Sequence, residues 1–164
     1  GRYNLLRSTL SFDVEGDRLV IGDPGKGMYF AILDDRGNKV GEFTANAPKI
    51  KITEKDKEVL IKRRKYIEGM SDQNWNRMMK HNDVVCPEFF PAFEKIDTAD
   101  NKIYVQTYTA KDNKREFIVF DFAGKELKRV FLPDARMWTV KNDTYFFLSY
   151  DEDSDEWSLN GTTI

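Results

Sequence analysis

The sequence is poor in the residues that most often build catalytic and metal sites. Its 164 residues include one cysteine, Cys86, and one histidine, His81. One cysteine excludes an internal disulfide. A catalytic or metal-binding histidine needs partners, and Asn82 and Asp83 are only its neighbours in sequence. We therefore interpret His81 as an ordinary residue at the C-terminus of a helix and Cys86 as a buried, unreactive thiol. We predict no catalytic residue, no metal and no cofactor.

Long apolar runs and an excess of one charge are also missing. No run approaches the ~18 residues of a membrane span, so none is predicted. The formal charge of −2 combines 26 basic with 28 acidic residues, and this balance argues against a dedicated nucleic-acid surface. Because the sequence begins at Gly1 rather than Met, we interpret it as a processed or trimmed chain. The compartment stays open, with a secreted or periplasmic location after removal of a targeting segment as one alternative.

Strand signals dominate what is present, most clearly from Phe93 to Pro133. After a weaker first run, this segment has three runs rich in β-branched and aromatic residues, KIYVQTYT, EFIVFDF and ELKRVFL. Asp and Asn residues separate the runs, and Gly124 stands where a type I turn with a bulge requires a positive φ. Four sequential strands with such connections form a β-meander.

The same pattern is repeated along the chain. ILDDRG at 32–37 matches VFDFAG at 119–124, and 12–19 matches 96–103 in the order apolar, Asp, turn, basic, apolar. A third copy begins at Met137, roughly 42 residues after the second, within the ~40–50 residues typical of propeller blades. We therefore predict blade-like units as follows: 9–44, 91–133 and a partial unit at 134–164.

Residues 45–90 have a different pattern and predict an α-helical insertion. Thr53 begins a sequence like a capping box, and Gly69 ends the Lys- and Glu-rich helix that follows. Ser71 is placed to cap a second, shorter helix. An apolar connector, VVCPEFFP, then leads into the second blade-like unit.

The segment from Ile96 to Pro133, with its K-I-Y-V-Q-T-Y and F-D-x-x-G-K-x-L-x-R-V-x-L-P sequences, resembles a blade of bacterial six-bladed β-propellers of the NHL-like kind. The aromatic-Pro stretch that precedes it is similar to theirs as well. The resemblance implies a mainly β chain of four-stranded antiparallel meanders, a partial propeller, with an α-helical insertion. An antiparallel barrel or sandwich is the competing fold, and the 40-residue repetition argues against it.

Six blades need roughly 240 residues at about 40 each, and this chain accounts for two to three. The whole chain, 1–164, is therefore predicted to be a single domain or a fragment of a longer propeller, or to assemble from several copies. Open strand edges would allow a homo-oligomer. We also predict that Tyr3 to Ser8 serves as a closing strand for the last, incomplete unit.

Two charged segments have ordinary explanations. Asp151 to Glu156 places carboxylates at alternate positions, as a calcium loop does, but Glu156 stands where that loop has Gly and Thr162 where it has Glu. We interpret it as a solvated hairpin tip. The basic run Lys62 to Lys65 follows acidic residues and is typical of a solvated helix face, with an anionic partner as the alternative.

The leading function is a non-enzymatic binding or scaffold module of the β-propeller type, with an unknown protein or a small molecule as its ligand. The candidate binding residues are Trp75, His81, Phe89, Phe90 and Tyr108, because insertions between blades commonly lie near the strand ends where ligands bind. One alternative is a propeller-type hydrolase or lyase, which would require histidines and carboxylates to converge. The other is a structural fragment without a site of its own.

Overall fold

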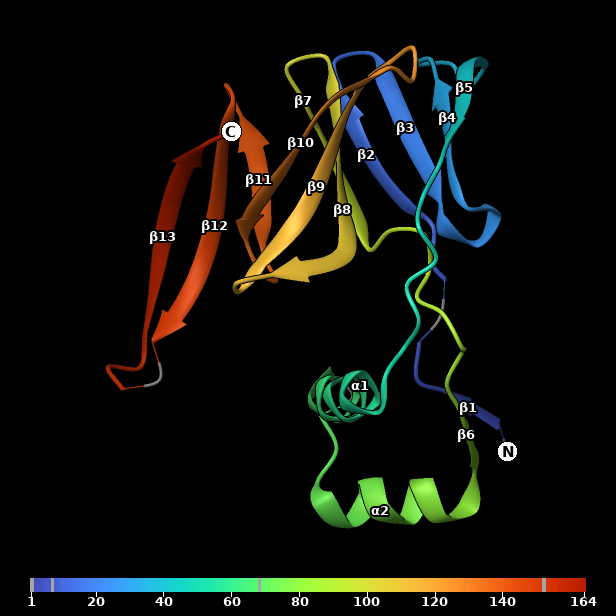
Figure 1. Cartoon of the computed structure of the whole chain (residues 1–164), viewed down its shortest axis with the longest axis vertical. Helices are drawn as coiled ribbons and strands as arrows, with labels where there is room; N and C mark the ends of the chain where they lie inside the picture. Colours follow the sequence, from blue (N-terminus) through green and yellow to red (C-terminus); the bar gives the residue numbers. More distant parts are fainter. Residues whose placement is uncertain (1, 7, 68, 152) are drawn as a thin grey trace. The chain divides into compact units, whose positions relative to one another are not determined.

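The computed structural model describes residues 2–6, 8–67, 69–151 and 153–164, and it is mainly β with two α-helices (Figure 1). The strands are β1 (Arg2–Asn4), β2 (Ser11–Glu15), β3 (Arg18–Asp23), β4 (Met28–Leu33), β5 (Lys39–Ala45), β6 (Asp83–Val85), β7 (Lys95–Ala99), β8 (Lys102–Lys111), β9 (Lys114–Asp121), β10 (Glu126–Pro133), β11 (Trp138–Lys141), β12 (Thr144–Asp151) and β13 (Glu156–Thr163). The helices are α1 (Glu54–Ile67), α2 (Asp72–His81) and the short 3-10 turn η1 (Pro24–Lys26). The prediction of a mainly β chain with four-stranded antiparallel sheets and helices is confirmed.

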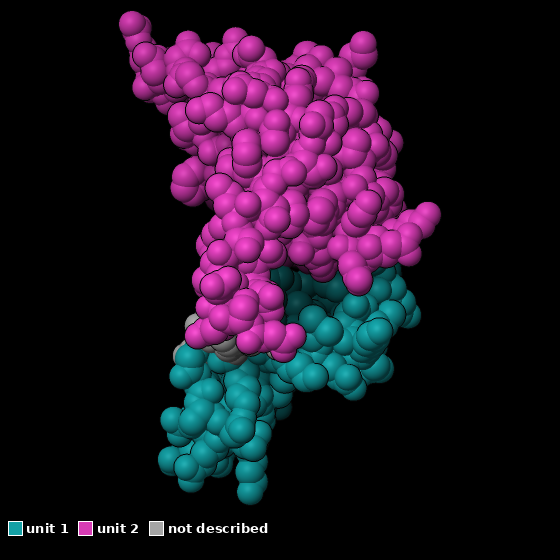
Figure 2. Space-filling model, turned by 90° about the vertical axis from the view of Figure 1, so that its left-hand side faces the viewer, with its two compact units in different colours: residues 1–8, 49–91 teal, residues 9–48, 92–164 magenta. Residues whose placement is uncertain are grey.

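The chain divides into two compact units, coloured separately in Figure 2. Residues 1–8 and 49–91 form the helical unit, and residues 9–48 and 92–164 form the β unit. Each unit is therefore assembled from segments that are distant in sequence.

Three antiparallel sheets make up the β unit. The first has the order β2-β3-β4-β5, the second β7-β8-β9-β10 and the third β11-β12-β13. Each is a meander in which consecutive strands are neighbours. The first strands of the three sheets, β2, β7 and β11, follow one another side by side (Figure 1). The described sheets are open, and no strand closes the set into a ring.

Two-residue turns with left-handed backbone join the first two strands of the second and third sheets. Asp100 and Asn101 have φ values of 55° and 56°, and Asn142 and Asp143 have values of 50° and 52°. Asn and Asp tolerate this region better than other residues with a Cβ atom, and two such residues in succession match the right-handed strand twist. The predicted positive φ at Gly124 is confirmed at 85°, with a bulge in the strand that follows.

Two hydrophobic cores lie between the three sheets, one at each interface. The core between the first and second sheets consists of aliphatic residues and phenylalanines: Val20, Met28, Phe30, Ile32, Phe93, Ile96, Ile103, Val105, Ile118 and Phe120. The core between the second and third sheets contains tyrosine and tryptophan side chains, which carry a polar atom, beside apolar residues. Its members are Ala99, Tyr104, Phe117, Val119, Leu132, Trp138, Val140 and Tyr145. The second sheet is therefore covered on both faces, as its nearly continuous apolar strands require.

In the helical unit, the chain start corrects one prediction. β1 pairs in parallel with β6, and the Leu5 amide donates to the Val85 carbonyl at 3.0 Å. Tyr3 contacts Trp75 edge to face at 6.0 Å. The prediction that Tyr3 to Ser8 closes the last sheet is therefore wrong, because Tyr3 and Leu5 make their contacts within the helical unit instead. Arg7, in the same segment, lies outside the described residues.

Both predicted helix starts are confirmed. The Asp56 amide donates to Thr53 Oγ1 at 3.2 Å, while the Thr53 amide donates to Asp56 Oδ2 at 2.9 Å. This is the reciprocal arrangement of a capping box, with Asp in the place of Glu. Ser71 Oγ accepts from the Asn74 amide at 3.4 Å and caps α2.

Candidate binding surfaces

Acidic and hydroxyl side chains of β2 bind the backbone of the neighbouring sheet. Asp13 Oδ2 accepts hydrogen bonds from the Thr98 amide at 2.6 Å and from Thr98 Oγ1 at 2.8 Å. On either side, Ser11 Oγ accepts from the Ile96 amide and Glu15 accepts from the Asn101 amide. Because alternate residues of a strand point the same way, these three side chains share one face of β2. They hold β2 against β7 in a fixed register.

The second and third sheets are joined in a similar way. Asp97 Oδ2 accepts from the Val140 amide at 2.7 Å, and Asp100 Oδ2 accepts from the Asp143 amide at 2.8 Å. Lys95 Nζ adds a bond to the Trp138 carbonyl at 3.0 Å. The repeat noted at 12–19 and 96–103 contains both Asp13 and Asp97, but the sequence alone gave no indication that they join successive sheets.

The two aspartates are also coupled to each other. Burial and a hydrogen bond with Asp13 raise the pKa of Asp97 to about 6. Burial would raise the pKa of Asp13 as well, but hydrogen bonds from Asp97 and Thr98 outweigh it, so that pKa is lowered. In the folded protein Asp97 therefore keeps its proton more readily and donates it to the Asp13 carboxylate. These groups are engaged in joining sheets, which is a structural role.

The first sheet leaves its other face uncovered. Phe12 and Val14 alternate with the joining residues of β2 and are 70% and 60% exposed. Their pairing partners, Ile21 on β3 for Phe12 and Leu19 for Val14, continue the apolar surface across the sheet. We call this the first end face: Leu10, Phe12, Val14, Leu19, Ile21, Ala31 and Leu33. On the outer strand β5 the same face carries Glu42, opposite Ala31, and Lys39, opposite Leu33, which form an ion pair at 2.8 Å. The apolar part of the face is therefore centred on β2 and β3, and exposed apolar patches on one sheet are typical of interaction surfaces.

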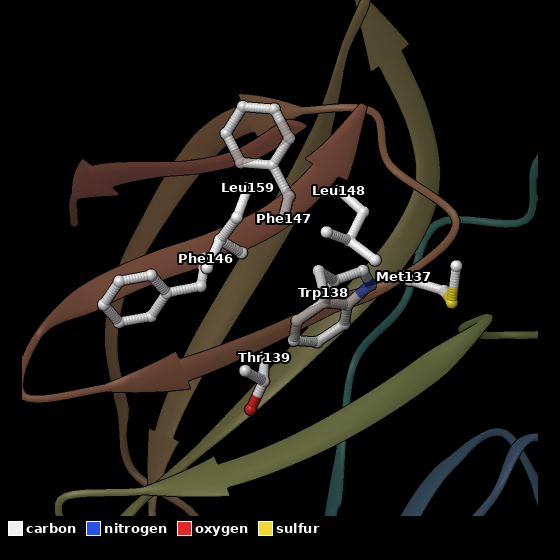
Figure 3. Close-up of a pocket in the computed structure, with 7 residues that line it drawn as sticks. All are labelled: Met137, Trp138, Thr139, Phe146, Phe147, Leu148 and Leu159. Atoms are coloured by element: carbon white, nitrogen blue, oxygen red, sulfur yellow. The ribbon is translucent and has the colours of Figure 1, made fainter. Parts of the chain in front are cut away.

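The third sheet is uncovered on its opposite side. Leu159 on β13 is 71% exposed and Trp157 is 61% exposed. Leu159 pairs with Leu148 of β12, and Trp157 pairs with Tyr150. We call this the second end face: Met137, Thr139, Phe146, Leu148, Tyr150, Trp157 and Leu159. A mostly apolar cavity of about 230 Å³ lies here, lined by Met137, Trp138, Thr139, Phe146, Phe147, Leu148 and Leu159 (Figure 3).

The helical unit has a larger cavity of about 460 Å³. Its lining combines apolar side chains with a few charged ones: Leu5, Glu54, Lys57, Glu58, Ile61, Met79, Val84 and Cys86. Lys57 forms an ion pair with Glu54 at 2.6 Å. Cys86 is half-buried rather than buried as predicted, and burial raises the pKa of its thiol, so it stays protonated and a poor nucleophile.

The predicted binding residues are distributed over both units. Trp75 is buried on α2 and contacts Tyr3, while His81 is the last residue of α2 and is exposed. Phe89 pairs with Lys51 in an isolated β-bridge, and Lys49 Nζ lies 5.9 Å from its ring centre.

Phe90 follows in the same connector of the helical unit, where its amide donates to the Ile50 carbonyl at 2.9 Å. Tyr108 lies on β8 of the β unit, and its carbonyl accepts from Arg115 Nη1. As a common binding site, the five residues stay a prediction. The sequence pattern did not predict the end faces, because the apolar pattern of a strand does not specify which of its faces another sheet covers.

Comparison with family models and with curated proteins finds no match to this chain. Among the described residues, no helix is long and apolar enough to cross a membrane. The same residues contain no group of three or more His, Cys, Asp or Glu side chains that could hold a metal ion. Glu152, in the segment compared with a calcium loop, lies outside the described residues.

Proposed function

We propose that this protein is a non-enzymatic binding or scaffold module of the β-propeller type, and that its end faces bind further β-sheets. The observation that carries this proposal is the contrast between the faces of equivalent sheets. Where two sheets meet within the chain, an apolar core forms between them. At both ends of the series an apolar face of the same kind is open to solvent.

The first strands of the sheets support the propeller assignment. In a propeller, successive meanders are arranged around an axis with their first strands innermost. Here β2, β7 and β11 are neighbours in the same order, and an aspartate of one sheet binds the backbone of the next at both junctions. Such junctions suit a rigid scaffold, because every bond fixes the register between two sheets.

The chemistry of the end faces supports a protein partner with an apolar sheet surface. The exposed side chains of the first end face, Leu10, Phe12 and Val14, are aliphatic or aromatic and carry no charge. Burying such area stabilises a complex by roughly 25 cal/mol per Å² before the entropy of association is subtracted.

Sedimentation velocity over a range of micromolar concentrations tests the proposal. The wild type is compared with a double variant, Phe12→Lys together with Leu159→Lys, which places one charge on each end face. The matched control is Phe131→Lys, at a 40% exposed phenylalanine of the second sheet. We expect the wild type and the control to associate and the double variant to stay monomeric.

Equal sedimentation of the wild type and the double variant at every concentration would overturn the proposal. Circular dichroism of each variant checks that the β unit is folded, since lysine at an exposed strand position removes little packing.

A further inference from the structure

We infer that the two end faces are partners of each other: the second end face of one copy stacks on the first end face of another, and two copies close a ring of six sheets. The inference rests on the proposed function and names its partner as a second copy of this chain. Each chain supplies three sheets, and propellers close with typically four to eight.

The repeat shows that the end faces are the two halves of one kind of interface. At each junction within the chain, the later sheet presents alternate residues of its first strand to the earlier sheet. These are Ile96 and Thr98 on β7, then Trp138 and Val140 on β11. The residues at the same places on β2 are Phe12 and Val14, which belong to the first end face.

The second end face has the matching half. The earlier sheet presents the other alternate residues of its first strand, Asp13 at the first junction and Asp97 at the second. The residue at the same place on β11 is Thr139, which faces away from the core. Its hydroxyl bonds the Asp97 carboxyl group, and the Val14 amide bonds the Asp13 carboxylate within its own chain. Thr139 therefore adds a small, uncharged side chain to the contact rather than a bond like that of Asp13.

The turns after the first strands add complementary charge. At the first junction Glu15 accepts from the amide of Asn101. The turn positions at the same places on the two end faces carry Lys141 in place of Glu15 and Asp17 in place of Asn101. Stacking one end face on the other brings this cation toward this anion. An ammonium and a carboxylate there replace the carboxylate and amide of the first junction, whereas at the second junction Ala99 stands at the place of Glu15.

Closure distinguishes this pairing from other modes of association. A contact between two different faces produces a ring if the rotation closes and an open filament if it does not. With three sheets in each copy, two copies bury both end faces of both chains and leave neither exposed. The product is therefore a dimer and stays a dimer as concentration rises.

The test uses single variants and then mixes them. Sedimentation equilibrium of the wild type should give twice the 19.2 kDa mass of the chain. Phe12→Lys alone and Leu159→Lys alone should each shift the mass toward that of one chain. Phe131→Lys, outside both end faces, should leave the dimer unchanged. The fold of each variant is checked by its thermal unfolding transition.

Mixing the two single variants gives the decisive result. The Phe12→Lys chain retains an intact second end face, and the Leu159→Lys chain retains an intact first end face. The mixture should recover a dimer that contains one of each, held by one intact junction. Mass spectrometry under native conditions separates it from either homodimer if one chain carries an isotope label.

Three outcomes would overturn the inference while leaving the proposed function in place. They are a mixture that stays monomeric although the wild type associates, a dimer disrupted by only one of the two variants, and a series of masses that grows with concentration. A dimer that survives both variants indicates pairing through strand edges and overturns both. Wild-type protein that sediments like the double variant also overturns both.

Discussion

At both interfaces within the β unit an aspartate of one sheet accepts from a backbone amide of the next sheet, yet the two cores differ. Between the first and second sheets, Phe30 is fully buried, with its ring centre 5.3 Å from Phe93 and 6.0 Å from Phe120. This core is held by packing alone, since its members carry no polar side-chain atoms.

Between the second and third sheets, polar atoms are buried with the aromatic rings. Trp138 Nε1 donates to Gln106 Oε1 at 2.8 Å, and the Tyr145 hydroxyl donates to the Pro133 carbonyl at 2.9 Å. Lys95 Nζ lies 4.3 Å from the centre of the Trp138 ring. Each buried polar group has a partner, which offsets the loss of hydration.

Different side chains therefore set the register between two sheets and fill the space between them. Carboxylates of the first strands set the register between sheets, and they are alike at both junctions. The core side chains fill the space between the sheets, and their chemistry varies from one junction to the next. A new neighbouring sheet therefore needs the backbone contacts and an apolar face, and it does not need the same core residues.

Among the variants that compare the two interfaces, truncation of Phe30 should lower the free energy of unfolding most. Phe30→Ala removes a fully buried ring from the core between the first and second sheets. We expect the free energy of unfolding to fall by about 3–5 kcal/mol, measured by urea denaturation. Phe131→Ala, at an exposed phenylalanine, is the control and should change it by less than about 1 kcal/mol. Similar losses in both variants would show that the core is not where the sheets are held.

Substitutions at two glycines in equivalent turns distinguish the cost of backbone strain from the cost of overpacking at the first interface. Gly37 and Gly124 both have positive φ, 80° and 85°. A Cβ atom on Gly124 would lie 2.5 Å from Phe43 Cγ, whereas one on Gly37 meets nothing within 4 Å. We expect Gly37→Ala to lower the free energy of unfolding by about 1–2 kcal/mol through strain.

Gly124→Ala should show the same strain and a further loss of about 1–3 kcal/mol from overpacking. Both variants are compared by chemical denaturation. Equal losses at the two positions would mean that Phe43 moves freely, and the close approach of these sheets would then have no energetic role.

The polar contact at the second interface should have an intermediate effect. Gln106→Leu leaves the Trp138 N–H buried without its acceptor, so we expect a loss of about 1–3 kcal/mol in the free energy of unfolding. Adding Trp138→Phe removes the orphaned donor. The double variant should then lose less than the sum of the two single variants in a double-mutant cycle. Strict additivity would indicate that the two side chains do not interact.

The shared proton of Asp13 and Asp97 should give the smallest effect. The pKa of Asp97 is raised to about 6 in the folded protein, so the folded state binds this proton more tightly than the unfolded state does. The stabilisation is therefore full below the ordinary aspartate pKa near 4 and is lost as pH rises through about 6. Solvent screening limits the change to about 1 kcal/mol.

Asp97→Asn tests this directly. Its amide can still accept from the Val140 amide through Oδ1 and can donate to Asp13 without titrating. The decline in the free energy of unfolding between pH 4 and 6 should disappear in this variant. If the decline persists, its source lies in another group. Because Asp13 has a lowered pKa, its contribution is lost as pH falls and remains in the variant.

Much of the local structure followed from residue types. The alternation in 102–109, the Asn and Asp turns and Gly124 predicted the strands and turns of the second sheet, because backbone preferences act within a few residues. Thr53 and Ser71 predicted the helix starts for the same reason. The chain start was misjudged, since whether Tyr3 packs on Trp75 or on a distant sheet depends on contacts that sequence order does not specify.

Residue types along the chain predict antiparallel meanders with a helical insertion, because strand periodicity and turn residues are local properties. Which faces are covered depends on how the sheets pack together. Phe12 and Ile96 occupy the same place in the repeat, yet Phe12 is 70% exposed and Ile96 is 2% exposed. Burial belongs to a pair of sheets rather than to one strand. The surfaces that we propose for binding therefore became visible only when the three sheets were placed side by side.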